Sequence, residues 1–126
     1  ISYAGPNALA RARLAGQVVE TRMREVHGCQ EQLRVDLIGV SALHGSAREV
    51  GSSEPASEPA EVRLRVAMRS LNRELADELP REVESLWLSG PAGGGGFRGR
   101  VVSSVVTRSA FLEREAVRPS VSIIEA

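Results

Sequence analysis

The strongest constraint on the fold of this chain is the alternation of large apolar side chains with arginine or small side chains over residues 61–70. The apolar positions are Val62, Leu64, Val66 and Met68, and the positions between them are Arg63, Arg65, Ala67 and Arg69. A period of two predicts a β-strand with one buried face. Because a row of arginines needs water, we expect the sheet to be open on that side, as antiparallel sheets allow. The arginines are interpreted as a solvated face, with binding of an acidic partner as the alternative.

Two segments with apolar residues at steps of three and four predict amphipathic helices. The first follows Asn7, a favourable N-cap residue, and stops at Gly28. The second follows Asn72 and contains Pro80, where we expect a kink or two abutting helices, because a proline inside a helix costs about 3 kcal/mol. The apolar stripe of the first helix is Leu9, Ala12, Ala15, Val19, Met23 and Val26, and that of the second is Leu75, Leu79, Val83 and Leu86.

Further strand-like segments lie at residues 1–4, 33–40, 99–113 and 121–125. The resulting order is strand, helix, strand, strand, helix, strand, with an extra strand at the C-terminal end. This is the βαββαβ order of the ferredoxin-like motif. We therefore predict an α+β fold, a two-layer sandwich in which two helices cover one face of a mainly antiparallel sheet. The chain has 126 residues and is expected to form a single domain over residues 1–126.

Residues 46–60 interrupt this pattern, because they are rich in Ser, Glu, Gly, Ala and Pro and have no period. Such a run inside a compact domain predicts a flexible inserted loop. The chain starts at Ile1, within a strand-like segment. We therefore expect it to be the C-terminal portion of a longer protein.

The composition excludes several classes of function. The 16 basic residues balance 16 acidic ones, so the chain has no electrostatic footprint for nucleic acid. No apolar run has the length of a membrane span, so no membrane partner is expected. All basic residues are arginine, which excludes chemistry that needs a lysine within these residues. The single Cys29 excludes an intrachain disulfide and fits a reduced, cytoplasmic setting.

The segment Gly90-Pro91-Ala92-Gly93-Gly94-Gly95-Gly96 is followed closely by Arg98 and Arg100. Successive glycine N–H groups can form an anion-binding nest, and the two arginines can add charge-assisted bonds to a phosphate or carboxylate. The candidate ligand site is therefore Gly93, Gly94, Gly95, Gly96, Arg98 and Arg100. Phosphate-binding loops, however, usually run from strand into helix, and this one runs from helix into strand. A tight connection or a packing loop is the competing interpretation, since glycine lets backbones approach closely.

The other polar candidates carry weaker signals. His27 and His44 do not have the spacing of a metal motif, so no metal site is predicted. His27 is interpreted as a helix C-terminal residue that interacts with the helix dipole, and His44 is a candidate catalytic histidine in the long loop. Cys29 is interpreted as a buried structural thiol. No catalytic residue is assigned, and no cofactor is implied.

Three segments resemble one known family. They are Ile1-Ser2-Tyr3-Ala4-Gly5-Pro6-Asn7-Ala8-Leu9-Ala10-Arg11-Ala12, then residues 34–40 with Leu43-His44-Gly45, then residues 82–88 with residues 90–96. In combination they resemble the second half of the acyclic terpene utilisation (AtuA) family domain, over most of the chain except residues 51–59. Pro80 departs from the unbroken helix expected there. The resemblance implies a soluble bacterial protein of acyclic terpenoid or branched acyl-CoA catabolism, with an acyl-CoA or terpenoid ligand and a long N-terminal portion.

These observations support two different functions. In the first, the chain is an enzyme or enzyme component whose substrate site is shared with the N-terminal portion and includes the glycine-rich loop. In the second, it is a structural or oligomerisation module that packs against another copy or against its own N-terminal portion. The first is favoured by the glycines beside Arg98 and Arg100, and the second by the absence of a nucleophile–base pair in the sequence.

Overall fold

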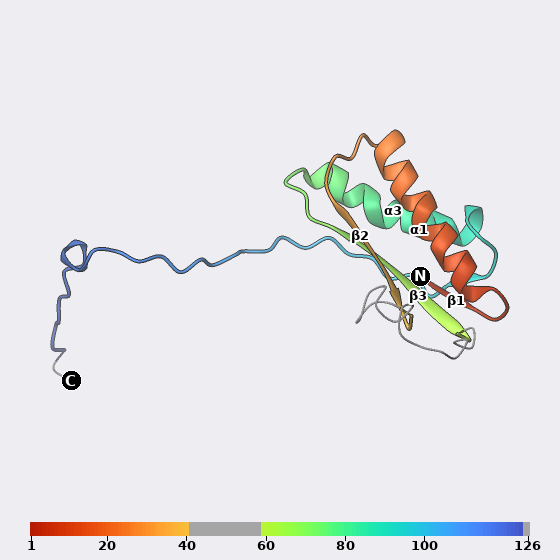
Figure 1. Ribbon diagram of the computed structural model, residues 1–126. Helices are drawn as coiled ribbons and strands as arrows, with labels where there is room; N and C mark the ends of the chain where they lie inside the picture. The colour runs from red at the N-terminus through yellow and green to blue at the C-terminus, as the bar shows by residue number, and fades with distance from the viewer. Residues whose placement is uncertain (41–58, 125–126) are drawn as a thin grey trace.

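The computed structural model describes residues 1–40 and 59–124 of the chain (Figure 1). Within these ranges the elements are β1 (Ser2–Ala4), α1 (Ala8–Glu25), β2 (Leu33–Ile38), β3 (Glu61–Met68), α3 (Arg73–Ser89), β4 (Gly94–Gly95) and a short 3-10 helix, η1 (Arg114–Ala116). The flexible loop predicted at residues 46–60 lies outside the described residues, except for residues 59 and 60.

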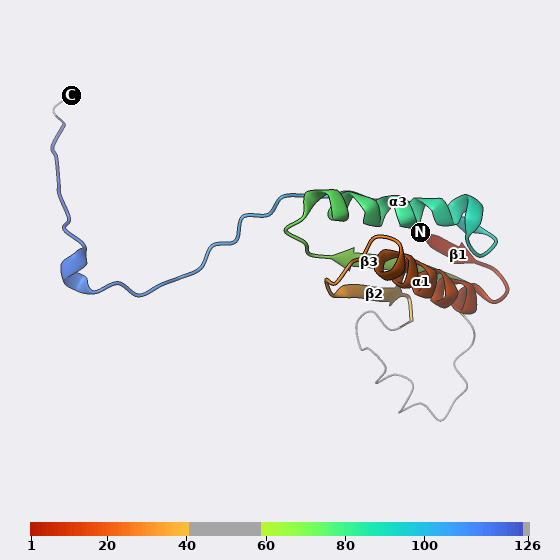
Figure 2. The same cartoon turned by 90° about the horizontal axis from the view of Figure 1, so that it is seen from above.

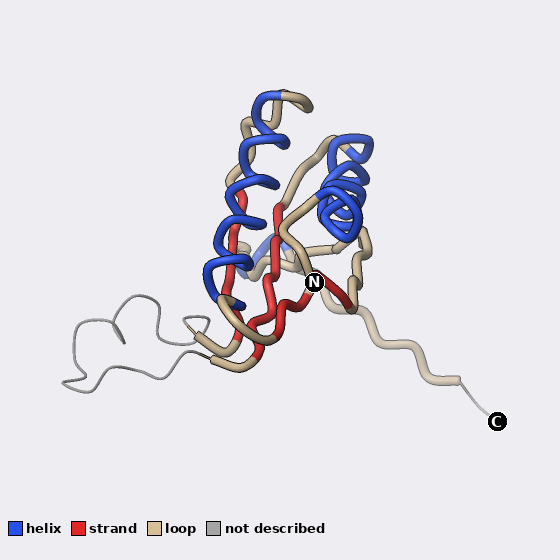
Figure 3. The backbone as a smooth tube through the Cα atoms, turned by 90° about the vertical axis from the view of Figure 1, so that its right-hand side faces the viewer, coloured by secondary structure: helices blue, strands red, loops and turns tan. Residues whose placement is uncertain are grey.

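The strands form one antiparallel sheet in the order β2-β3-β1-β4. In the described part of the chain, α1 and α3 lie side by side over one face of this sheet (Figures 2 and 3). The α+β sandwich predicted from the sequence is therefore confirmed. The succession strand, helix, strand, strand, helix, strand also agrees with the order expected of a ferredoxin-like motif.

The arginine-bearing segment forms β3, an inner strand of the sheet, and its alternation correctly predicts a strand with one buried face. Val62 and Leu64 are 0% and 2% exposed on the helix side, whereas Arg63 and Arg65 are exposed on the other side. β3 pairs with β2 from Arg63 opposite Ile38 to Met68 opposite Leu33, and with β1 at its N-terminal end. The face opposite the helices is thus the open one.

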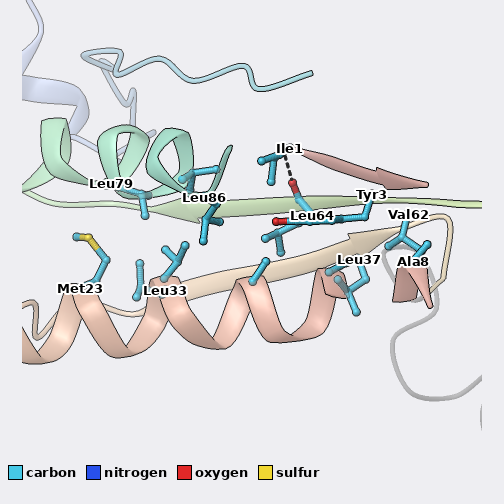
Figure 4. Packing of buried hydrophobic residues seen from close by; sticks show 14 of the residues in the cluster. Ile1, Tyr3, Ala8, Met23, Leu33, Leu37, Val62, Leu64, Leu79 and Leu86 are labelled. Atoms are coloured by element: carbon cyan, nitrogen blue, oxygen red, sulfur yellow. Dashed lines mark hydrogen bonds between the residues drawn. The ribbon is translucent and has the colours of Figure 1, made fainter. Parts of the chain in front are cut away.

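The core between the helices and the sheet is aliphatic, with one tyrosine (Figure 4). The largest fully buried side chains are Tyr3, Met23, Leu64, Val19 and Val62. Each large apolar side chain contributes about 1.5–3 kcal/mol when it is removed from water. The packing of α1 and α3 on β1 and β3 therefore supplies most of the driving force for this fold.

The ends of α1 agree with the predicted positions, although Asn7 does not cap the helix with its side chain. Asn7 has a left-handed φ of 57°, and its side chain makes no capping hydrogen bond. Its carbonyl oxygen instead accepts the N–H of Arg11 at 3.0 Å. Gly28 has a φ of 63°, which suits a glycine directly after a helix. Val26 was expected in the buried stripe but is 60% exposed, because α1 already ends at Glu25.

Helix α3 begins as predicted and continues through its proline. Asn72 Oδ1 accepts the N–H of Leu75 at 3.2 Å, which is an N-cap hydrogen bond. Pro80 lies inside one uninterrupted helix, so the alternative of two abutting helices is wrong. Pro80 stands between buried residues, with Leu79 before it and Val83 and Leu86 after it. Their packing offsets the backbone hydrogen bond that the proline cannot make.

The strands predicted at residues 99–113 and 121–125 are not formed in the described residues. The edge strand after α3 is only Gly94–Gly95, and η1 is the one regular element described beyond it. Figure 1 shows the C-terminal segment running away from the body of the fold. Its apolar side chains are exposed, with Val105 at 94% and Phe111 at 106%. High β-propensity does not make a strand where the side chains and backbone have no neighbour to pair with.

Candidate functional site

The open face of the sheet carries arginines on β2 and β3, and one acidic residue lies between them. Asp36 stands opposite Arg65 in the β2–β3 register. Its carboxylate accepts hydrogen bonds from Arg34 Nε at 3.0 Å and from Arg65 Nη1 at 3.2 Å. The Asp36 side chain is 12% exposed, so its charge is largely committed to these two arginines. Arg65 is therefore a poor candidate for binding an external anion.

A groove of about 940 Å³ lies between β3, the N-terminal half of α3 and residues 97–104. Its apolar lining includes Leu64, Val66, Leu79, Val83 and Phe97. Its basic lining consists of Arg63, Arg65, Arg69, Arg73, Arg98 and Arg100. Residues from two distant parts of the sequence thus surround one basic groove.

The structure separates the two halves of the predicted ligand site. Arg98 and Arg100 line the groove, whereas none of Gly93, Gly94, Gly95 and Gly96 does so. The glycine run nevertheless has a link to the groove, because Arg63 Nη2 lies 3.5 Å from the carbonyl oxygen of Gly96. Residues 93–96 therefore position the start of the segment that carries the two arginines.

The first two glycines of this run are packed against the chain itself. A Cβ on Gly93 would lie 2.6 Å from Arg11 Nη1, and the φ of Gly93 is 78°. A Cβ on Gly94 would lie 3.0 Å from Ile1 Cδ1 and 3.2 Å from Tyr3 Cε1. A methyl group at Gly93 would displace the end of the Arg11 side chain and would be strained by the positive φ, whereas at Gly94 the Ile1 and Tyr3 side chains would have to shift by a few tenths of an ångström. Close packing thus explains these two glycines without a ligand.

Arg11 holds the turn after β1 and the loop before β4 together. Its guanidinium donates to the carbonyl oxygens of Ala92 and Ala4, each at 2.6 Å, and of Pro6 at 2.9 Å. It also stands over the ring of Tyr3, 5.9 Å from the ring centroid. From the sequence alone, no role was assigned to Arg11. The acceptors are backbone carbonyl groups, which every residue carries, so no particular residue type in the sequence marks them.

Glu82 is a buried charged residue that sequence reasoning also missed. It lies on α3, is 7% exposed, and accepts hydrogen bonds from Arg22 at 2.5 and 3.0 Å. His27 Nε2 lies 2.7 Å from Glu82 Oε1. The Arg22 hydrogen bonds hold the pKa of Glu82 below its usual value, which outweighs the opposing effect of burial. His27 thus has a specific carboxylate partner in addition to its place near a helix end.

The remaining candidates show no reactive arrangement in the described residues. Cys29 is 2% exposed, and its Sγ lies 3.8 Å from Met68 Sδ. Burial raises the pKa of the Cys29 thiol, which agrees with the predicted structural role. Across residues 1–40 and 59–124, no group of three His, Cys, Asp or Glu side chains is placed to hold a metal ion. His44, the candidate catalytic histidine, lies outside the described residues.

Comparison with known proteins adds a family assignment. None of the helices in the described ranges is both long and apolar enough to cross a membrane. No curated protein and no solved structure matches the chain significantly. The sequence profile of the family described as acyclic terpene utilisation family protein AtuA matches residues 1–123, which is essentially the whole chain. The chain therefore belongs to the acyclic terpene utilisation (AtuA) family.

Proposed function

We propose that this chain is a ligand-binding part of a protein of acyclic terpenoid or branched acyl-CoA catabolism, and that its arginine-lined groove holds the anionic end of the ligand. The observation that supports this most is the convergence of Arg63, from β3, with Arg98 and Arg100, from the segment after β4, on one groove. Family membership supports the class of compound. A carboxylate or phosphate is the chemical group that a cluster of arginines binds best.

Arg98 and Arg100 are the residues to which we assign the anion. Among the described residues they have no ion-pair or hydrogen-bond partner, whereas Arg65 already shares Asp36 with Arg34. Both are exposed and line the groove. A guanidinium without an internal partner keeps its five N–H donors available for a bound anion.

The glycine-rich loop has a supporting role in this proposal. Gly93 and Gly94 allow close packing on Arg11 and Tyr3, and this packing fixes where residues 97–100 begin. Direct contact with the anion is assigned to the arginines rather than to the glycine N–H groups. The apolar part of the ligand is assigned to the N-terminal portion that the resemblance implies.

Titration calorimetry with isovaleryl-CoA, a methyl-branched acyl-CoA, tests this function. Replacing both Arg98 and Arg100 by Ala should weaken binding by about tenfold or more, because hydrogen bonds to charged groups contribute about 1.5–3 kcal/mol each. Arg118→Ala, which removes an exposed arginine of the C-terminal segment, is the matched control and should bind like the parent. Equal affinity in the double variant would exclude this groove, and absence of binding by the parent would exclude this ligand class.

A structural or oligomerisation module is the second candidate function. It is supported by apolar side chains left uncovered on the described chain, among them Trp87 at 58%, Leu88 at 95% and Phe111 at 106% exposure. Exposed apolar surface of this kind is typical of contact with another chain or domain. Light scattering across a concentration series distinguishes the two functions. A dimer that dissociates in a Trp87→Ser, Leu88→Ser variant would favour the module.

A further inference from the structure

A second hollow lies beside the groove, on the other side of β3. Its volume is about 360 Å³, and it is lined by Gln32 and Arg34 at the start of β2 and by Ala67, Met68 and Arg69 at the end of β3. The three β3 residues also line the groove, so the two depressions are neighbours. We call this second depression the β2–β3 hollow.

The register of the two strands explains why the surface is depressed here. β2 and β3 lie side by side in antiparallel pairing (Figure 1). On the open face β3 carries Arg63, Arg65, Ala67 and Arg69, so Ala67 is the one small side chain in a row of arginines. Ala67 stands opposite Arg34. Because a methyl group faces a long side chain at this pair, space is left above Ala67.

The polar groups around the β2–β3 hollow are mainly hydrogen-bond donors. Asp36 binds Arg34 through Nε alone, at 3.0 and 3.1 Å, so both terminal Nη groups of Arg34 keep their N–H donors. Arg69 is exposed and has no ion-pair or hydrogen-bond partner within residues 1–40 and 59–124. Continued by one residue beyond the ladder, the register brings the amide side chain of Gln32 opposite Arg69.

No acidic residue of the described ranges lines the β2–β3 hollow. The carboxylate of Asp36 is directed to Arg34 and Arg65. That of Glu31 accepts the hydroxyl of Ser70 at 2.6 Å. The positive charge around the hollow is therefore only partly neutralised, which favours an anion as its occupant.

We propose that the β2–β3 hollow binds a phosphate monoester, held by Arg34, Arg69 and the side-chain amide of Gln32. A phosphate monoester has three terminal oxygens and more negative charge than a carboxylate, so it can accept from donors on both strands. The hydrogen bonds from Arg34 Nε to Asp36 position this guanidinium before any ligand arrives. Arg65, in contrast, already uses its terminal Nη1 on Asp36.

The place of the hollow beside the groove also narrows the class of ligand, a step that rests on the proposed function. CoA carries a phosphate monoester on its ribose, in addition to the diphosphate that leads toward its thioester. With the diphosphate at Arg98 and Arg100 and the ribose phosphate at Arg34 and Arg69, one ligand is held on both sides of β3. A free terpenoid acid has a single carboxylate and uses only one of these sites. The pair of sites therefore selects a CoA thioester.

Amide NMR spectra recorded during a titration with inorganic phosphate test the hollow by itself. The amides of Gln32, Arg34 and Arg69 should shift and reach saturation, whereas sodium chloride at matched ionic strength should shift them much less. Arg69→Ala should weaken phosphate binding about tenfold, and the control Arg118→Ala should leave it unchanged. Equal shifts in phosphate and chloride, or full affinity in Arg69→Ala, would overturn the proposal.

Ala67→Val tests the same hollow without changing any charge. Valine fills the space opposite Arg34, and its β-branched side chain suits an exposed strand position, so the variant should melt within a few degrees of the parent. Its phosphate affinity should nevertheless fall about tenfold, as in Arg69→Ala. Full phosphate affinity in a folded Ala67→Val variant would place the bound phosphate elsewhere and overturn the proposal.

Calorimetry with isovaleryl-CoA and with its dephospho form, which lacks the ribose phosphate, tests whether both sites hold one ligand. The parent should bind the complete thioester about tenfold more tightly, and Arg69→Ala should abolish this preference. No preference in a parent whose affinity still depends on Arg98 and Arg100 would overturn the CoA assignment and leave the proposed function standing. If the parent binds neither compound, the ligand class of the proposed function fails, and the phosphate titration still decides the hollow.

Discussion

Arg22 of α1 donates two hydrogen bonds to the carboxylate of Glu82 on α3, at 2.5 and 3.0 Å. The Glu82 side chain is 8% exposed and that of Arg22 is 48% exposed, so the pair lies at the edge of the core rather than in water. The pair lowers the pKa of Glu82 and raises the pKa of Arg22, so each side chain is held more firmly in its charged form. The Glu82 carboxylate therefore links the two helices, and its hydrogen bonds with Arg22 offset the cost of its burial.

We expect Glu82→Gln to destabilise the protein by about 1–3 kcal/mol, because the substitution leaves Arg22 and His27 without their charged partner in a partly buried place. Glu78→Gln is the matched control on the same helix. Glu78 pairs with Arg81 at the surface, where an ion pair contributes about 0.2–1 kcal/mol. Urea unfolding of both variants measures the difference, and equal losses would show that Glu82 is no more important than a surface residue.

The same carboxylate predicts an acid dependence of stability. The pKa of Glu82 is lower in the folded state than in the unfolded chain. Its contribution is therefore complete above the ordinary glutamate pKa of about 4.3 and is lost as the pH falls through the lower, folded value. The gap in unfolding free energy between the parent and Glu82→Gln should be constant from neutral pH down to about 4.3 and should then shrink as the pH falls toward the lower, folded pKa. A gap that grows on acidification would contradict the assignment.

Arg11→Ala should destabilise the protein by about 1.5–3 kcal/mol, since three backbone carbonyls, those of Ala4, Pro6 and Ala92, lose their charged donor at once. Arg24→Ala, which removes an exposed arginine near the end of the same helix, is the control and should change stability by less than about 0.5 kcal/mol. Thermal unfolding checks both. If the two variants melt alike, Arg11 does not hold the loops together.

Adjacent glycines of the β4 strand should respond differently to alanine. Gly94→Ala places a methyl group against Ile1 and Tyr3 and should cost about 1–3 kcal/mol. At Gly95 nothing lies within 4 Å of an added Cβ, so Gly95→Ala should be neutral within about 0.5 kcal/mol or slightly stabilising. Denaturant midpoints of the two single variants give the comparison. A larger loss at Gly95 would indicate that something outside the described chain approaches this position.

The sequence predicted the parts of this fold that depend on local periodicity. The alternation along β3 and the stripes of α1 and α3 identify their buried faces because each side chain's direction repeats with the backbone. The C-terminal valines led to a wrong strand prediction. Their β-propensity is high, but a strand at Val105 also needs a neighbouring strand to pair with. Arg11 and Glu82 were missed for a related reason. Their roles depend on groups far away in the chain, 81 residues from Arg11 to Ala92 and 60 from Arg22 to Glu82.

The sharing of Asp36 by Arg34 and Arg65 has a consequence for diffusing ions. One negative charge against two positive ones leaves the β2 side of the open face weakly positive, whereas Arg98 and Arg100 have no carboxylate partner among the described residues. The electrostatic potential should therefore rise across the face, from β2 toward the segment after β4. If the groove binds an anion as proposed, this gradient should steer the anion toward it, and the association rate should decrease steeply as salt is added.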